Sequence, residues 1–506
     1  MVTQVIGTCT PEAQPFSRGR TLAACLGPAD RRNVSLQLLA RTQPVAHLAD
    51  RLGVSRKFLY QQAAKASEAL DDAFAPAGCD DIALFHIPVT KDWLRQFVLA
   101  QVLIGHTSFR GVMEILDAVF DYRGISLGTV HNIVRDAVGK ARQINAAQGL
   151  SEIHVGAHDE IYQAGQPVLV GMDVRSTYCY LLSAEDHCDQ TTWGVRLLDL
   201  ADQGLSVDYT IADGGKALRA GQAAAWDDVP CHGDVFHAER ELEKLAFFLK
   251  NRAAGCISAR EKIERKMQRC KKKRRGQTLS KRLASGRQAE RQAIQLAADI
   301  HALADWMKND ILSLAGPDLA TRRELFDFIV EELHRCEGLC PHRIGPVRRT
   351  LQRQRDNLLA FVGILDERFA EVAMQMKVSP ALVHAVCELQ GMDRNRPVYW
   401  QRERRLREKL RCRFRSVESA VRRILAETPR ASSIVENLNS RLRNYFFLRR
   451  HIGNEYLDLL RFFLNHRRFL RSDRPERVGK SPTELLSGNP HSHWLELLGY
   501  QRFGRN

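Results

Sequence analysis

The sequence predicts a multidomain α+β protein in which a small mixed sheet is interrupted by a large all-helical insertion. Three observations predict this fold class. Short apolar runs separated by turn formers occupy residues 153–183, strand and helix patterns alternate from there to residue 237, and helical periodicity then continues to about residue 429. Alternating apolar residues are typical of strands, whereas apolar residues three or four positions apart are typical of helices.

The sheet is predicted from the order of its elements. Turn formers at Ala164–Pro167 and Asp173–Ser176 separate the first three strands and predict an antiparallel meander. The predicted strands are Ile153–Tyr162, Pro167–Gly171, Thr177–Ser183, Val207–Ala212 and Val229–Val235, and the predicted helices are Thr191–Leu200 and Lys216–Trp226. Three strands, a helix, a strand, a helix and a fifth strand follow one another in the order of an RNase H-like core.

Carboxylates lie at two informative places in this sheet. Asp159 is inside the first strand, on the face that alternation also gives to Val155, Ala157 and Ile161. A charge among apolar neighbours is costly unless it is paired or bound to a cation. Asp213 ends the fourth strand, at the edge where open sheets with helical crossovers collect ligands. Because two-metal phosphoryl chemistry needs carboxylate ligands, these positions predict part of a metal site.

A third carboxylate is expected from a later helix, and Glu436 provides it. Ser432 or Ser433 would cap this helix, and its predicted buried stripe is Val435, Leu438, Leu442, Tyr445 and Phe446. Glu436, Asn439, Ser440, Arg443 and Phe447 share an adjoining face. Two alternatives stay open here: Glu436 would also suit the dipole of a first helical turn, and Asp213 could belong to a plain turn.

Two neighbouring carboxylates are assigned to structure rather than to the site. Glu160 adjoins Asp159 but points to the opposite face of the strand, so only one of them can be catalytic, and the apolar neighbours favour Asp159. Asp173 lies in the turn after the second strand, where Asp is common.

Four segments resemble the DDE transposases of bacterial insertion sequences. They are His158–Tyr162, Ile211–Gly215, Asp234–His237 and Val435–Arg443. The resemblance implies that Asp159, Asp213 and Glu436 are catalytic and hold two Mg²⁺ ions, with Mn²⁺ as an alternative. It also implies that a further group supports these ligands or positions the substrate: Asp234, His237, Asn439 and Arg443. The Tyr and Arg that some groups of the family place before the Glu are not evident in this chain.

The resemblance implies a transposase that binds the terminal inverted repeats of a mobile element. Such an enzyme catalyses metal-dependent strand cleavage and strand transfer into target DNA, and it acts as a dimer or larger assembly on paired ends. Two other classes stay open. One is an RNase H-like nuclease or resolvase without strand transfer, and the other is a domesticated DNA-binding protein with an inactive site. The intact set of Asp159, Asp213 and Glu436 argues against the last class.

Composition favours a polyanionic partner. The chain has 506 residues with 75 Lys and Arg against 59 Asp and Glu, a formal net charge of +16. Basic residues release counterions from phosphates when they bind DNA. Residues 1–20 contain no continuous apolar run, so we expect no secretory signal, and we find no apolar run long enough to predict a membrane span. The 12 scattered Cys fit a reducing compartment, so we expect a cytoplasmic, nucleoid-associated protein without a membrane partner.

Two N-terminal segments are candidates for DNA recognition. Residues 1–30 are predicted to be disordered, and residues 31–70 have helix-turn-helix spacing, with Ser55 as the N-cap of the second helix. The exposed start of that helix carries the predicted base-reading residues Arg56, Lys57, Tyr60 and Gln61. A plain helical hairpin is the alternative. After a linker at Asp71–Pro88, residues 90–145 form a second helical or helix-turn-helix domain.

In that second domain, Ser126 would cap a helix with one apolar face. The residues left outside this face are His131, Asn132 and Arg135, which are predicted to contact DNA. The alternative is a helical brace without a recognition role.

The core is predicted to have a first part, residues 151–237, and a C-terminal part, residues 431–500, on either side of a basic helical insertion at 238–430. Lys271, Lys272 and Lys273 belong to a basic run that either contacts DNA phosphates or is a solvated helix end. Trp306 and Trp400 lie in the insertion, where buried packing is their expected role. The resemblance leaves open a second role, because an insertion-domain Trp stacks on a flipped base in some related enzymes. A group with Cys and His, residues 334–342, does not have the spacing of a common zinc site.

Overall fold

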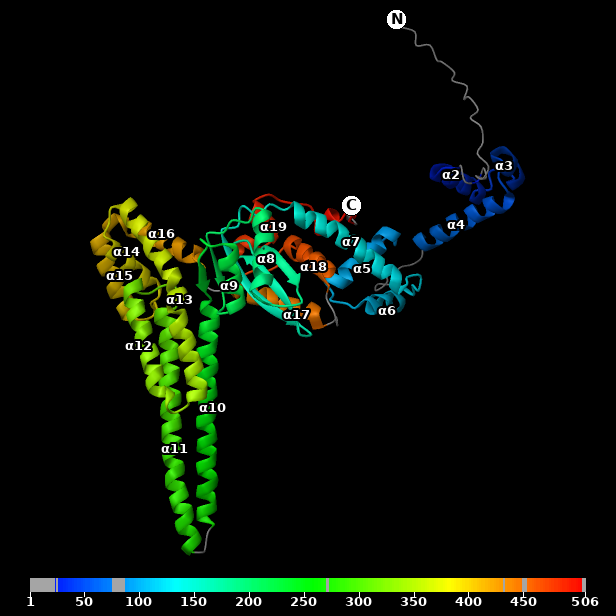
Figure 1. The fold of residues 1–506 in the computed structure, drawn as a ribbon. Coiled ribbons are helices and arrows are strands. Elements are labelled where there is room, and N and C mark those ends of the chain that lie inside the picture. Colours follow the sequence, from blue (N-terminus) through cyan, green and yellow to red (C-terminus); the bar gives the residue numbers. More distant parts are fainter. Residues whose placement is uncertain are drawn as a thin grey trace. The chain divides into compact units, whose positions relative to one another are not determined.

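The computed structural model describes residues 23, 26–74, 87–269, 273–430, 433–447 and 453–502, without the side chains of Lys273, Arg275 and Ser433. The chain divides into two compact units, Met1–Pro88 and Val89–Asn506. The α+β class is confirmed, since one five-stranded sheet accompanies many helices (Figure 1).

The first unit is a three-helix bundle of α2 (Pro28–Leu39), α3 (Val45–Leu52) and α4 (Arg56–Phe74). Its small core consists of Val34, Leu48, Ala49, Val54 and Leu59. A tight turn joins α3 to α4 because Gly53 adopts a left-handed conformation, with φ of 63°, and the Ser55 hydroxyl accepts a hydrogen bond from Phe58 N at 3.1 Å.

The boundaries of this unit differ from the prediction at two places. The predicted disorder through residue 30 is wrong for residues 28–30, which begin α2 with Pro28 at the first helical turn. The predicted linker also begins too early, because α4 continues to Phe74. Most of residues 1–25 and residues 75–86 lie outside the described part of the chain.

The second unit is organised by the sheet, whose strand order is β3-β2-β1-β4-β5. The strands are β1 (Val155–Gln163), β2 (Gln166–Asp173), β3 (Cys179–Ala184), β4 (Tyr209–Ala212) and β5 (Cys231–Gly233). The predicted antiparallel meander of β1, β2 and β3 is confirmed, and β4 pairs parallel to both β1 and β5. The parallel strands place the end of β4 beside the middle of β1, with Ala212 opposite His158.

Helices cover both faces of the sheet. On one face, α8 (Gln190–Asp202) and α9 (Lys216–Ala225) pack on a core that includes Leu169, Trp193 and Leu218. On the other face, β2 residues Val168 and Val170 join a larger core. The alternation of these β2 residues between the two cores is the period-2 pattern expected of a strand buried on both sides.

The larger core is shared by helices from both ends of the unit. α5 (Lys91–Leu103), α6 (Phe109–Phe120) and α7 (Leu127–Ala147) contribute to it, as do α17 (Ser433–Phe447) and α18 (Asn454–His466). The predicted apolar faces of α7 and α17 are confirmed as buried. Ser126 caps α7 as predicted, and Arg142 and Asn145 of α7 bond to Asp458 of α18. The predicted second helical domain therefore shares its core with the sheet and braces it.

Helix α18 closes the outer edge of the sheet. The Asn454 side chain bonds to Ala184 N at 2.7 Å and Ala184 O at 3.0 Å, and the Asn465 side chain bonds to Cys179 N and O, both at 2.8 Å. The eleven residue steps from Asn454 to Asn465 in α18 and the five steps from Cys179 to Ala184 in β3 each span about 16.5 Å. Because these lengths match, the two amides replace a missing neighbouring strand at both ends of β3 and protect an edge prone to unwanted pairing.

We expect Asn465→Ala to lower the free energy of unfolding by about 1–3 kcal/mol, because it leaves the buried amide and carbonyl of Cys179 without partners. Denaturant unfolding followed by circular dichroism measures the change. Asn489→Ala is the control, since Asn489 is exposed. An Asn465→Ala protein as stable as the parent would contradict this role.

The insertion is helical throughout its described residues, as predicted, and has its own core. Its helices are α10 (Val235–Gln268), α11 (Lys273–Trp306), α12 (Leu319–Glu337), α13 (Pro341–Met376), α14 (Pro380–Gln390), α15 (Pro397–Leu410) and α16 (Phe414–Glu427). α10 and α11 run side by side as a long two-helix arm (Figure 1). The prediction that Trp306 and Trp400 are buried is wrong, because they are 50% and 58% exposed.

The C-terminal part differs from the prediction in one boundary. Helix α18 ends at His466 rather than continuing to residue 470, and the following loop folds back so that Phe469 and Val478 form an isolated bridge. α19 (Pro482–Ser487) begins after a capping box of Ser481 and Glu484, and α20 (Trp494–Leu497) follows. No helix in the described part of the chain is long and apolar enough to cross a membrane.

Candidate active site

Asp159 lies on the sheet face that α17 covers. Its carboxylate accepts a hydrogen bond from Asn439 Nδ2 at 2.7 Å and another from Glu160 N at 2.8 Å. Asn439 is 280 residues away in sequence and only 1% exposed. Asn439 follows Glu436 by three residues on α17. This helix therefore bonds to Asp159 through Asn439 and places Glu436 one turn before that contact.

Asp213 immediately follows β4, in the turn that leads to α9. Its Oδ1 accepts a hydrogen bond from Gly215 N at 2.8 Å, which fixes the carboxylate against its own turn. A Cβ at Gly214 would lie only 1.9 Å from Gln354 Nε2, so a larger residue there would require the Gln354 side chain of α13 to move. Gln354 is a neighbour of the site that the sequence did not predict, since nothing distinguishes it within a 36-residue helix.

His237 connects Glu436 to the start of α10. Its Nδ1 lies 2.5 Å from Asp234 Oδ2, and its Nε2 lies 3.5 Å from Glu436 Oε1. Asp234 has a fully buried side chain and caps α10 by accepting a hydrogen bond from Phe236 N at 2.9 Å. Arg240, one turn further along α10, lies 3.5 Å from the same oxygen of Glu436. The first two turns of α10 therefore hold two basic side chains beside Glu436.

The Asp159 carboxylate lies within electrostatic reach of Asp213, Glu436 and His237. The pKa of Asp159 is raised to about 6, mainly by burial and to a smaller extent by the charges of Asp213 and Glu436. The hydrogen bond from Glu160 N and the charge of His237 act in the opposite direction. The hydrogen bond that His237 Nδ1 donates to Asp234 raises the pKa of His237 to about 9, with added support from the charges of Asp234, Asp159 and Asp213. His237 is therefore a cation at neutral pH, surrounded by carboxylates from four segments.

The donor set has the chemistry that Mg²⁺ prefers, since the carboxylates offer hard oxygen ligands and one of them is a desolvated anion. Among the residues that the structure describes, however, no three His, Cys, Asp or Glu side chains are grouped closely enough to bind one ion. Asp213 and Glu436 are near enough to Asp159 to raise the pKa of Asp159, and Glu436 lies 3.5 Å from both His237 and Arg240.

Neither a protein-family comparison nor a comparison with curated proteins finds a match for this chain.

The remaining predicted site residues occupy different positions. Arg443 is exposed on α17, one turn beyond Asn439. Glu160 accepts a hydrogen bond from Trp193 Nε1 at 2.9 Å on the α8 side of the sheet, so its predicted orientation away from Asp159 is confirmed. Asp173 is 2% exposed and bonds to Ser176, which confirms its structural role in the turn.

The predicted DNA-contacting residues are exposed wherever the structure describes them. This holds for Arg56, Lys57, Tyr60 and Gln61 on α4 and for His131, Asn132 and Arg135 on α7. Arg135 bonds to Asn132 Oδ1 at 2.9 Å within α7. Lys271 and Lys272 lie outside the described residues, and so does the side chain of Lys273.

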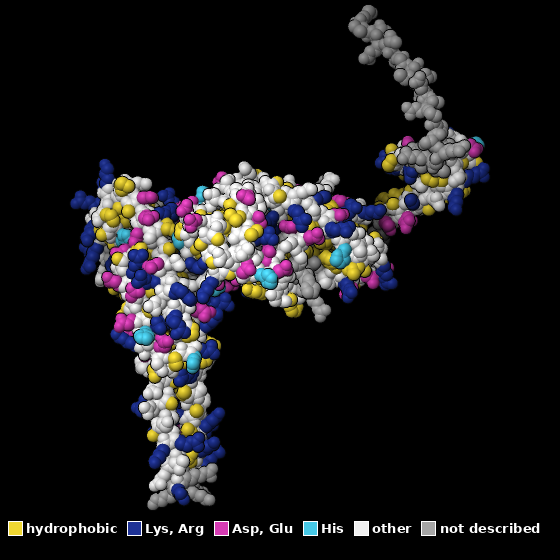
Figure 2. All heavy atoms as spheres, in the orientation of Figure 1, with side chains coloured by type: hydrophobic (Ala, Val, Ile, Leu, Met, Phe, Trp, Pro, Cys, Tyr) yellow, Lys and Arg dark blue, Asp and Glu magenta, His cyan; other side chains and the backbone are white. Residues whose placement is uncertain are grey.

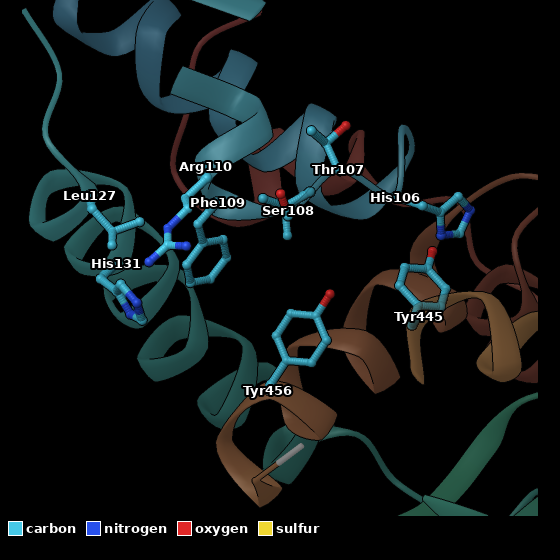
Figure 3. Close-up of a pocket in the computed structure, with 10 residues that line it drawn as sticks. His106, Thr107, Ser108, Phe109, Arg110, Leu127, His131, Tyr445 and Tyr456 are labelled. Carbon is cyan, nitrogen blue, oxygen red and sulfur yellow. The ribbon is translucent and has the colours of Figure 1, made fainter. Parts of the chain in front are cut away.

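A pocket of about 450 Å³ lies beside the exposed face of α7. Figure 3 shows that its walls come from the start of α6, from α7 and from the ends of α17 and α18. Half of its ten lining residues carry an aromatic ring: His106, Phe109, His131, Tyr445 and Tyr456. Tyr445 follows Glu436 by nine residues on α17, which places this pocket about 13.5 Å along the helix from the candidate site.

We expect Asp159→Asn to stabilise the metal-free protein at pH 8 by about 2–3 kcal/mol, although it removes a candidate catalytic group. The pKa of Asp159 is about 6 in the folded state, above its usual value of 3.8. Its charge therefore destabilises the fold above pH 6, and this destabilisation disappears as the pH falls below about 4. Thermal melting of the variant and the parent in EDTA, at pH values from about 4 to 8, measures the difference in stability.

Asp227→Asn removes an exposed carboxylate and is the control, for which we expect little change. A stabilisation by Asp159→Asn that did not decrease at acidic pH would contradict the electrostatic explanation.

Proposed function

We propose that the protein is a DDE-type transposase that binds the terminal inverted repeats of a mobile element. It catalyses metal-dependent DNA strand cleavage and strand transfer. The observation that carries the proposal is that Asp159 of β1 is largely buried near Asp213, which follows β4, and Glu436 of α17, whose charges raise the pKa of Asp159. A buried, repelling group of carboxylates costs stability, and such groups concentrate at functional sites.

The arrangement of the unit supports an RNase H-like core. The sheet order β3-β2-β1-β4-β5, with β3, β2 and β1 antiparallel and β4 and β5 parallel to β1, agrees with the element order from which that core was expected. The helical insertion separates β5 from α17, which suits a Glu that joins the two Asp from a distant part of the chain.

In the proposed reaction, Asp159, Asp213 and Glu436 would hold two Mg²⁺ ions, which supply activation of the attacking oxygen and stabilisation of the leaving oxygen. Asn439 holds the Asp159 carboxylate by its 2.7 Å hydrogen bond. His237 and Arg240 keep Glu436 near the site, and Asp234 fixes the orientation of His237. These residues position the ligands before DNA arrives.

The exposed start of α4 is the proposed surface for the inverted repeats. We expect Arg56→Ala with Lys57→Ala to weaken binding to element ends, with a loss that shrinks as salt rises, because phosphate contacts are screened and counterion release becomes less favourable. Gel-shift titration over a salt series measures the effect. The control is Lys65→Ala, further along α4. Equal affinity of the double variant and the parent would exclude α4 as the reader.

The function is tested with labelled duplexes that carry the DNA ends flanking the gene. In Mg²⁺ the protein should cut at the element ends and join the cut strand to a second duplex, as a dimer or larger assembly on paired ends. Cleavage without joining would replace the proposal with a nuclease or resolvase. End binding with neither reaction would replace it with an inactive DNA-binding protein.

A further inference from the structure

The free end of the α10–α11 arm concentrates the positive charge of the chain. Between Arg265 and Ala289 there are eleven Lys or Arg residues and no Asp or Glu, whereas the whole chain has a net charge of +16. We call the exposed, described members of this stretch the basic tip: Arg265, Lys266, Arg269, Arg274, Lys281, Arg282 and Arg287. Figure 2 shows Lys and Arg side chains along this part of the arm, where Asp and Glu are scarce.

The acidic residues nearest to the basic tip are Glu264 on α10 and Glu290 on α11, and both form ion pairs. Arg260 pairs with Glu264 at 2.7 Å and with Glu290 at 2.8 Å, and Arg287 pairs with Glu264 at 2.9 Å. These contacts set the register of the two helices and place Arg269 level with residues 281–282. Five members of the basic tip form no ion pair with a described residue: Lys266, Arg269, Arg274, Lys281 and Arg282. Both helices thus present uncompensated cations at the same level.

The outer arm has little core of its own. Among the described residues 254–295, the buried apolar side chains are Leu283 and Ala293. Apolar burial is the dominant stabilising contribution in folding, and self-repulsion of like charges opposes it. A protruding, weakly packed cationic hairpin therefore has the properties of a surface that binds a polyanion.

The position of the basic tip is set by α10 itself. His237 lies in the first turn of α10 and contacts Glu436, and Arg265 follows 28 residues later on the same helix. At a rise of 1.5 Å per residue, the tip begins about 42 Å from the candidate active site. Duplex DNA rises 3.4 Å per base pair, so this distance corresponds to about 12 base pairs.

We infer that the arm is a second DNA-binding surface, which contacts duplex phosphates without regard to sequence about 12 base pairs from the phosphodiester at the active site. The distance rests on the proposed function, because it is measured from the proposed catalytic residues. The phosphate contact does not, because it follows from the charge and exposure of the arm. Duplex DNA fits a site of this kind because its charge is regularly spaced along a rigid axis.

The test uses the full-length protein with Arg265, Lys266, Lys281 and Arg282 all changed to Gln. Fluorescence anisotropy measures Kd for random-sequence duplexes of 8, 12, 16, 20 and 30 base pairs between 50 and 200 mM salt. We expect the parent to gain affinity between 8 and 20 base pairs, where a duplex becomes long enough to reach both surfaces. The variant should not show this gain, and its slope of log Kd against log salt should fall by about 0.9 for each phosphate that the arm no longer neutralises.

The matched control changes four arginines that already pair with acids on the insertion surface: Arg335, Arg355, Arg402 and Arg404. This control variant loses the same number of positive charges as the tip variant, and its affinity should depend on duplex length as that of the parent does. Circular dichroism should show parental helix content for both variants, since the tip variant keeps the ion pairs of Arg260.

A tip variant with the parental salt slope and length dependence would overturn the inference. So would a tip variant that changes only the oligomeric state in light scattering, because the arm would then join copies of the chain. The catalytic assignment and the role of the arm are tested by different measurements. Cleavage that survives Asp159→Asn would overturn the catalytic assignment but would leave the salt slope of the tip variant unchanged.

Discussion

Asp159→Asn, Asp213→Asn and Glu436→Gln should each reduce strand cleavage and transfer by at least about a thousandfold. Each change keeps the shape of the side chain but removes a negative charge that the proposed metal site needs. Binding to end DNA should stay within a few fold of the parent, because the proposed binding residues on α4 lie in the other compact unit. Cleavage of an end-bearing duplex in Mg²⁺, run beside a gel-shift titration of the same preparations, measures both quantities.

Glu160→Gln is the matched control for Asp159→Asn. The two carboxylates are adjacent in β1, but Glu160 bonds to Trp193 on one side of the sheet and Asp159 to Asn439 on the other. We expect Glu160→Gln to retain activity. Loss of activity in Glu160→Gln with normal cleavage by Asp159→Asn would place the catalytic carboxylate on the opposite face. Normal cleavage by Glu436→Gln would place the third carboxylate elsewhere in the helical region.

Asn439→Ala should give an intermediate loss of about 10–100-fold, since Asn439 orients a proposed metal ligand rather than binding the ion itself. The reduction should be partly recovered at higher Mg²⁺ concentration, because a poorly held ligand lowers metal affinity. The same titration of Glu436→Gln should show no such recovery. A loss in Asn439→Ala that did not respond to Mg²⁺ would assign Asn439 a role other than holding Asp159.

The second large effect is expected in the insertion, where Arg322→Met should destabilise the fold by about 3–5 kcal/mol because several buried carbonyls lose their donor together. Arg322 is 1% exposed and donates hydrogen bonds to four backbone carbonyls in the turn after α11: Ile311, Ser313, Leu314 and Pro317. Its guanidinium also lies 5.7 Å from the ring centre of Phe361. Methionine fills part of the space but leaves these carbonyls without donors.

Hydrogen exchange of α12 peptides, read by mass spectrometry, would locate this loss within the insertion rather than averaging it over both units. The control is Arg323→Met at the next position, whose side chain is 48% exposed and lies 3.5 Å from Asp356. An exposed ion pair of this kind contributes about 0–1 kcal/mol. Equal exchange in the two variants would contradict the capping role of Arg322.

The local elements of this protein were predictable because they depend on neighbours in sequence. Alternation in β1 separated Asp159 from Glu160 onto opposite faces, and the structure has both as predicted. The three- and four-residue spacing of α17 likewise predicted its buried stripe. Helix ends were less certain: α18 ends at His466, where the chain begins its fold back toward Lys480.

Tertiary structure alone decided which distant residues meet. The hydrogen bond between Asn439 and Asp159, the approach of His237 to Glu436 and the packing of Gln354 on Gly214 join segments separated by most of the insertion or more. No local pattern encodes these contacts, because they depend on how the insertion returns the chain to the sheet. The sequence by itself determined the strands, the helices and the face on which each carboxylate lies. The approach of Asp213 and Glu436 to Asp159, and the closing of β3 by α18, required helices of a particular length and direction to pack on the sheet.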